Sequence, residues 1–63
     1  MPIVQISVAK GRSPEQLRAL LGEVHDAVVR SLDAPPQSVR VLVTEVPTEL
    51  WLSGGQTLAE KAG

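Results

Sequence analysis

Residues 13–36, SPEQLRALLGEVHDAVVRSLDAPP, decide the fold of this 63-residue chain because they hold one helix with signals at both ends. Ser13 is an N-cap, Pro14 suits the first helical position, and Gln16 completes a capping box. The apolar residues of the stretch recur at spacings of three and four: Leu17, Leu20, Leu21, Val24, Val28 and Leu32. The two prolines that close the stretch cannot continue a helix. The pattern predicts one amphipathic helix over Pro14–Leu32.

A strand is predicted on each side of this helix. In residues 2–9, PIVQISVA, apolar side chains alternate with smaller or polar ones, which is typical of a strand with one buried face. Residues 38–46, SVRVLVTEV, are apolar on both faces, so we expect this strand to be covered on both sides. A helix between two strands of matching length predicts a β-α-β unit with parallel strands and a right-handed crossover. The fold class is therefore α/β (α+β).

Two strands and one helix are too little for a stable domain. A chain of 63 residues also buries only about 60% of the surface that it exposes when unfolded. The sequence has no cysteine and a single histidine, His25, which excludes a disulfide and leaves no metal site to expect. We therefore expect residues 1–63 to form one domain that self-associates, with the missing strands supplied by another copy of the chain. The tail after Pro47 is expected to form a small hairpin at Gly54-Gly55 that packs on a neighbour.

The charge balance argues against several classes of partner. The chain has six basic and seven acidic residues, for a net charge of −1, so it lacks the basic character of a nucleic-acid-binding protein. No apolar run approaches the roughly 18 residues of a membrane span, and the first residues do not resemble a secretory signal. We expect a soluble cytoplasmic protein with no nucleic-acid or membrane partner.

Four residues are candidates for chemistry: Pro2, Arg12, Arg40 and Trp51. Each has an ordinary explanation by itself. Proline is tolerated at the first position of a strand, most arginines are solvated or paired, and a lone tryptophan is most often an interface anchor. Pro2 becomes chemically distinctive only if Met1 is removed, because its nitrogen is then a free secondary amine.

The predicted topology makes the combination more informative than its members. Parallel strands start at the same edge, so Pro2 and Arg40 can lie together. Arg12 follows the far end of the first strand, about 25–30 Å away by strand rise, and can reach only the Pro2 of a partner. An interfacial site of this kind places two guanidinium groups near one amine, with Trp51 as an apolar wall.

Such a site favours proton transfer on an acidic substrate. Nearby positive charge and desolvation both lower the pKa of an amine, so the Pro2 nitrogen can serve as a general base near neutral pH. Arg12 and Arg40 can bind substrate carboxylates and stabilise enolate charge as it develops. Two arginines predict a small substrate with carboxylate or oxo-acid groups at both ends.

Several segments carry a resemblance to a known family. They are PIVQI at 2–6, GRS at 11–13, EQ at 15–16, RSLDAP at 30–35, SVRV at 38–41, TE at 44–45 and GG at 54–55. Together they make the chain resemble the 4-oxalocrotonate tautomerase family, the small tautomerases with an amino-terminal proline. The resemblance covers nearly the whole chain, and the RSLDAP, SVRV and TE segments at fixed spacing are its specific part.

The resemblance implies a hexamer built as a trimer of dimers, in which two β-α-β protomers form a four-stranded sheet. The hexamer is most simply of one kind of chain, although a heteromer also fits. It implies keto-enol tautomerisation of 2-hydroxydienoates such as 2-hydroxymuconate, without a metal or cofactor. By position, Pro2 matches the base, which moves a proton from the 2-hydroxyl to C5. Arg12 matches the residue that binds the distal carboxylate, and Arg40 the residue at the 2-oxo end. Trp51 stands where the family has an aromatic wall.

Two alternatives stay open at this point. The chain can be a non-catalytic binding or assembly subunit, because an amine blocked by Met1 cannot act as a base. It can also be a hydratase or dehalogenase of the same superfamily. Those relatives use a carboxylate to activate water, whereas Ser53 stands at the matching place and Glu49 lies only nearby.

Overall fold

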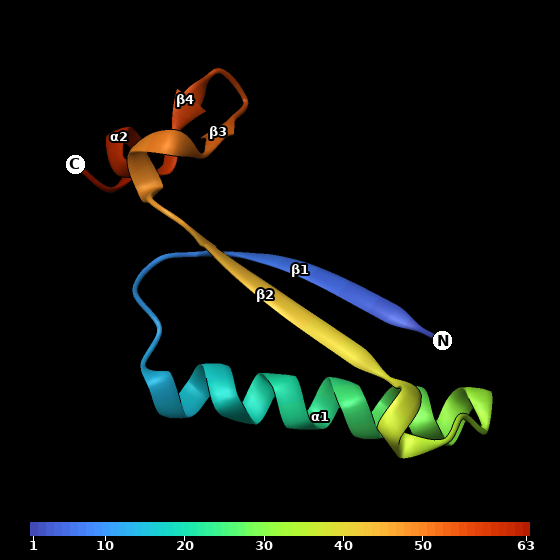
Figure 1. Cartoon of the computed structure of the whole chain (residues 1–63). Coiled ribbons are helices and arrows are strands. Elements are labelled where there is room, and N and C mark those ends of the chain that lie inside the picture. Colours follow the sequence, from blue (N-terminus) through green and yellow to red (C-terminus); the bar gives the residue numbers. More distant parts are fainter.

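The computed structural model describes all 63 residues as two unequal parts (Figure 1). The larger part contains strand β1 (Ile3–Ala9), helix α1 (Pro14–Leu32), the 3₁₀ turn η1 (Pro36–Ser38) and strand β2 (Arg40–Val46). The smaller part follows β2 and stands beyond one end of the sheet (Figure 1). The β-α-β order confirms the predicted fold class.

Helix α1 has the predicted bounds because its end signals are local. The Ser13 hydroxyl accepts a hydrogen bond from the Gln16 amide at 3.1 Å, and the Gln16 side chain accepts one from the Ser13 amide at 3.0 Å. This is the predicted capping box. At the other end Asp33 adopts the left-handed conformation, with φ of 52°, and closes the helix.

Strands β1 and β2 are parallel, and their register pairs Ile3 with Arg40 and Ala9 with Val46. The predicted second strand began at Ser38, which is two residues too early. The Ser38 amide and hydroxyl both bond the Pro35 carbonyl, at 2.9 and 2.7 Å, and this turn delays the strand to Arg40. The turn that follows the two prolines therefore extends two residues further along the chain than expected.

The sheet has one covered face and one open face in this protomer. Val4, Ile6, Val41 and Val43 lie on the partly buried face, against which α1 packs. The opposite face carries Ile3 and Leu42, which are 60% and 50% exposed. β2 was predicted to be covered on both faces. In the protomer α1 covers one of them, and the other face lies open.

The smaller part contains the 3₁₀ turn η2 (Thr48–Leu50), strands β3 (Leu52–Ser53) and β4 (Gln56–Thr57), and helix α2 (Leu58–Ala62). The predicted hairpin is confirmed: β3 and β4 are antiparallel and are joined by Gly54 and Gly55, whose φ angles are 63° and 85°. Positive φ at both turn residues is typical of a two-residue hairpin. Helix α2 was not predicted, although Thr57 and Glu60 form a second capping box at its start.

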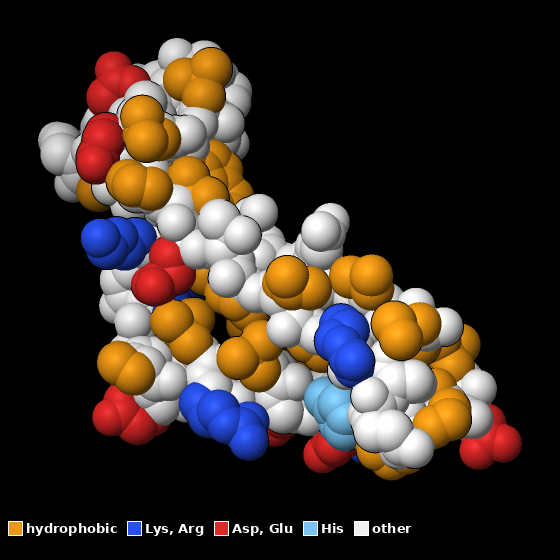
Figure 2. Space-filling model, in the orientation of Figure 1, with side chains coloured by type: hydrophobic (Ala, Val, Ile, Leu, Met, Phe, Trp, Pro, Cys, Tyr) orange, Lys and Arg blue, Asp and Glu red, His pale blue; other side chains and the backbone are white.

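A single protomer has almost no interior. Only Val39, at 7% exposure, is buried among 63 residues. The accessible surface is 4700 Å², against about 3,900 Å² expected for a compact monomer of this mass. Hydrophobic side chains are spread over the visible surface of both parts (Figure 2). The fold therefore presents apolar surface that a compact monomer would bury.

No helix in the chain is both long enough and apolar enough to cross a membrane.

Candidate active site

Pro2 and Arg40 lie side by side at the starting edge of the sheet. The Arg40 amide donates a hydrogen bond to the Pro2 carbonyl at 3.0 Å, one step before the Ile3–Arg40 pair of the register. The prediction that parallel strands bring these two residues together is confirmed. The bond uses the Pro2 carbonyl and does not involve the Pro2 nitrogen.

The guanidinium of Arg40 is held by backbone carbonyls. Its Nη1 donates to the Gln37 carbonyl at 2.8 Å and to the Val39 carbonyl at 3.4 Å. No acidic side chain pairs with it, and none of the hydrogen bonds in the chain uses its Nε or Nη2. Two nitrogens of a rigid planar group, with three N–H donors between them, therefore remain for a ligand carboxylate.

Arg12 and Trp51 lie at the other end of the sheet. Arg12 stands between the end of β1 and the start of α1, and Trp51 follows η2, beyond the end of β2. Seven strand residues at 3.3 Å each separate this end from Pro2 by about 23 Å. Arg12 forms no ion pair, and the Trp51 carbonyl accepts a hydrogen bond from the Leu58 amide at 2.9 Å.

One protomer thus brings together Pro2 and Arg40 at one end of the sheet, and places Arg12 and Trp51 at the other. The four candidate residues do not meet within a single chain. An arrangement that unites them needs at least two protomers, with the starting edge of one sheet near the far end of another.

His25 has a structural contact that reaches the site end of the sheet. Its Nε2 lies 2.9 Å from the Pro36 carbonyl and its Nδ1 lies 3.1 Å from Asp26 Oδ1. The bond to the Pro36 carbonyl, followed by the bond to Asp26, raises the pKa of His25 above its usual value. The His25 side chain is 34% exposed, so it is partly buried. Nowhere do three His, Asp or Glu side chains gather as a metal ion would require.

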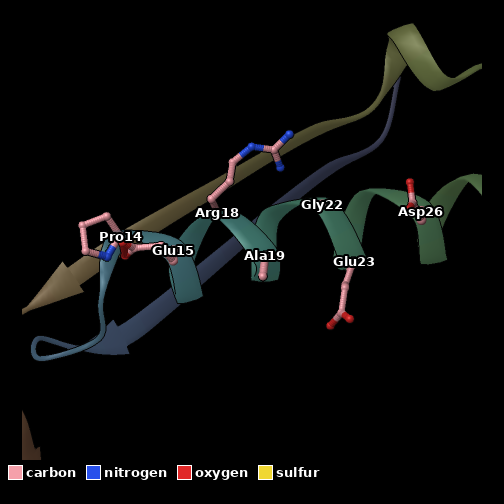
Figure 3. A pocket seen from close by; sticks show the side chains of 7 residues that line it. All are labelled: Pro14, Glu15, Arg18, Ala19, Gly22, Glu23 and Asp26. Atoms are coloured by element: carbon pink, nitrogen blue, oxygen red, sulfur yellow. The ribbon is translucent and has the colours of Figure 1, made fainter.

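The outer surface of α1 carries a shallow depression (Figure 3). In Figure 3 the Arg18 and Asp26 side chains project to one side of the helix and Glu23 to the other. None of the four candidate residues lines it, so it is separate from the predicted site. A second hollow, between α1 and β2, is lined by residues that include Arg18, His25 and Val39.

Comparison with known proteins identifies the family. The family model described as tautomerase enzyme matches residues 2–61. The chain belongs to the tautomerase family. Its sequence is 51% identical over 57 residues to a 2-hydroxymuconate tautomerase of Stutzerimonas stutzeri, covering 90% of each chain. It is 51% identical over 61 residues to a 2-hydroxymuconate tautomerase of Pseudomonas putida, covering 97% of this chain and 95% of the relative.

Solved structures agree with this family and fold. TomN, a 4-oxalocrotonate tautomerase homologue of the tomaymycin biosynthetic pathway, superimposes with a TM-score of 0.94 at 36% identity, covering 97% of this chain and 94% of TomN. A heterohexamer 4-oxalocrotonate tautomerase from Chloroflexus aurantiacus gives a TM-score of 0.91 at 35% identity, covering 95% and 97% of the two chains. The predicted family resemblance is confirmed. The chain is a tautomerase, an enzyme of the isomerase class.

Proposed function

We propose that this tautomerase, after removal of Met1, converts 2-hydroxydienoates such as 2-hydroxymuconate into their 2-oxo isomers, with the Pro2 nitrogen as general base. The observation that carries the proposal is the pairing of Pro2 with Arg40 at the starting edge of the sheet, through a 3.0 Å hydrogen bond. That pairing supports a site in which the Pro2 amine and the Arg40 guanidinium act together. Relatives that are 51% identical are named 2-hydroxymuconate tautomerases, which supports this substrate class.

The reaction is a balanced proton transfer within one molecule. The amine of Pro2 removes the proton of the 2-hydroxyl, and the oxygen becomes a carbonyl as the double bonds shift along the chain. The resulting ammonium returns the proton to C5, where a new C–H bond forms. Nothing is gained or lost overall, so an amine that can both accept and release a proton near neutral pH is sufficient.

The arginines bind and stabilise the substrate in this proposal. The free Nε and Nη2 donors of Arg40 suit the 2-oxo group and the adjacent carboxylate, where negative charge develops. Arg12 binds the distal carboxylate, and Trp51 forms an apolar wall beside the diene. Both lie at the far end of their own sheet, so they act in the site of another protomer.

Assembly is therefore part of the proposed function. The open sheet face and the single buried residue support an oligomer, which we take to be a homohexamer made of three dimers, each with a four-stranded sheet. In this arrangement residues 1–63 act as one domain. The structural relative from Chloroflexus aurantiacus is described as a heterohexamer, so a second kind of chain is the alternative assembly to test.

The direct test is ketonisation of 2-hydroxymuconate by the protein and by a Pro2→Ala variant. Alanine at position 2 retains the carbonyl that accepts from Arg40 and also permits removal of Met1, so the fold and the free amino terminus are kept. We expect kcat/KM to fall by about 10²- to 10⁴-fold, the usual contribution of a general base. An unchanged rate in the variant, whose chain would then begin with a primary amine, would show that the secondary amine of Pro2 is not required.

A further inference from the structure

His25 makes the side-chain hydrogen bond that spans the longest stretch of sequence in the chain. The bond between its Nε2 and the Pro36 carbonyl, at 2.9 Å, joins residues eleven positions apart. Every other side-chain hydrogen bond joins residues no more than three positions apart. This contact is therefore the one side-chain hydrogen bond that fastens η1 to α1.

The turn η1 in turn holds Arg40. The Pro36 carbonyl that meets His25 also accepts the Val39 amide, at 3.4 Å, which closes the turn. The next carbonyl, that of Gln37, accepts the Arg40 guanidinium at 2.8 Å. A displacement of η1 would therefore move the group to which the Arg40 side chain is bound.

The charges around the ring decide how this contact responds to pH. On α1, Asp26 accepts from Nδ1, and the cation Arg18 lines the same hollow as His25. Val39, just before β2, and Val41, within β2, also line the hollow and carry no charge. The turn η1 contributes only the Pro36 carbonyl. Asp26 is therefore the single acidic group that faces the ring.

Both ring contacts are satisfied only when the ring is protonated. The protonated ring donates from Nε2 to the Pro36 carbonyl and from Nδ1 to the Asp26 carboxylate. A neutral ring has one donor. If that donor stays on Nε2, the Nδ1 lone pair faces a carboxylate oxygen at 3.1 Å, which is repulsive.

We propose that His25 is a positioning residue that fastens η1 through the Pro36 carbonyl and so sets the orientation of the Arg40 guanidinium. The inference rests on the proposed function, in which Arg40 binds the substrate, and adds a residue outside the site that governs it. The protonation state of the His25 ring then affects the position of the Arg40 guanidinium through the backbone carbonyls of η1. His25 itself does not contact the substrate.

The first test is an NMR titration, which needs no substrate. In the full protein, the Arg40 amide and Nε–H resonances should shift with the same midpoint as the His25 ring. In a His25→Gln variant, whose amide can donate to the Pro36 carbonyl but does not titrate, those resonances should lose this transition. If the His25 ring titrates while both Arg40 resonances stay constant, the proposal is wrong, whatever the activity of the protein.

The second test is a double-mutant cycle on ketonisation of 2-hydroxymuconate. His25→Phe keeps a ring but removes both hydrogen bonds, and we expect it to lower kcat/KM by about 3- to 30-fold, less than the ~10²-fold cost of a 1 Å misplacement. His25→Gln should restore most of the loss. In an Arg40→Ala background His25→Phe should cost nothing further, because its effect passes through Arg40. Equal losses in both backgrounds would show a merely structural role.

The two tests separate this inference from the proposed function. An inactive parent protein would overturn the proposed reaction, and the NMR titration would still decide whether His25 controls Arg40. An active parent with additive losses in the cycle would preserve the reaction and overturn the positioning role.

Discussion

The Arg40 amide bonds the carbonyl of Pro2, not its nitrogen, at 3.0 Å. The start of β2 therefore anchors Pro2 through its carbonyl, and this bond does not involve the Pro2 nitrogen. The same strand start carries the guanidinium that the proposed reaction needs. A parallel β-α-β unit creates this neighbourhood automatically, because both strands begin at one edge.

Replacing Arg12 with alanine tests whether this arginine binds the distal carboxylate of the substrate. We expect kcat/KM for 2-hydroxymuconate to fall about 10- to 100-fold, since hydrogen bonds to charged groups contribute about 1.5–3 kcal/mol. A 2-hydroxydienoate with one carboxylate should be much less affected. Arg30→Ala, an exposed arginine in the last turn of α1, is the matched control. Equal losses on diacid and monoacid would refute the distal-carboxylate role.

Replacing Leu42 with lysine tests whether other protomers cover the open sheet face. Leu42 is 50% exposed in the protomer, and a lysine there would place a charge in the proposed interface. We expect light scattering to give a smaller assembly and a matching loss of activity. Glu23→Lys, on the outer surface of α1, should leave the mass unchanged (Figure 3). An intact assembly in the Leu42→Lys variant would place the interface elsewhere.

The pH dependence of unfolding should report His25. Bonds to the Pro36 carbonyl and Asp26 raise its pKa in the folded state, so the folded chain binds this proton more tightly than the unfolded chain. The resulting stability is fully present below the unfolded pKa, about 6.5, and is lost as pH rises through the folded pKa. Urea unfolding at a series of pH values should show this decline, and His25→Gln should lack it. A parent and variant with identical pH profiles would contradict the assignment.

Removing the Ser13 hydroxyl should weaken the start of α1. Ser13→Ala loses one half of the capping box, and we expect the free energy of unfolding to fall by about 1 kcal/mol. Ser31→Ala, near the other end of the same helix, should change it by less than about 0.5 kcal/mol. Urea denaturation at fixed protein concentration measures both, and equal changes would show that the capping box contributes little.

The parts of the fold that could be predicted are those with local causes. Ser13 and Gln16 mark one end of α1, and the prolines after Asp33 mark the other, so the helix bounds followed from the sequence. The start of β2 did not, because Ser38 is drawn into a turn by the Pro35 carbonyl. Helix α2 was missed because five residues are too few for a clear apolar period.

In the candidate site, too, features with local causes could be predicted, and those that depend on packing could not. Pro2 and Arg40 could be placed together because strand register alone decides their distance. The contact of His25 with the Pro36 carbonyl could not be foreseen, because it depends on how α1 packs beside η1, eleven residues later. Its only sequence signal was a lone histidine beside the apolar face of the predicted helix.

The most direct measurement of the central claim is the intact mass of the purified protein, followed on the same sample by ketonisation of 2-hydroxymuconate. We predict that active protein lacks Met1. A fraction that retains Met1 should be inactive, because its Pro2 nitrogen is an amide without a basic lone pair. Full activity in protein that retains Met1 would contradict Pro2 as the base.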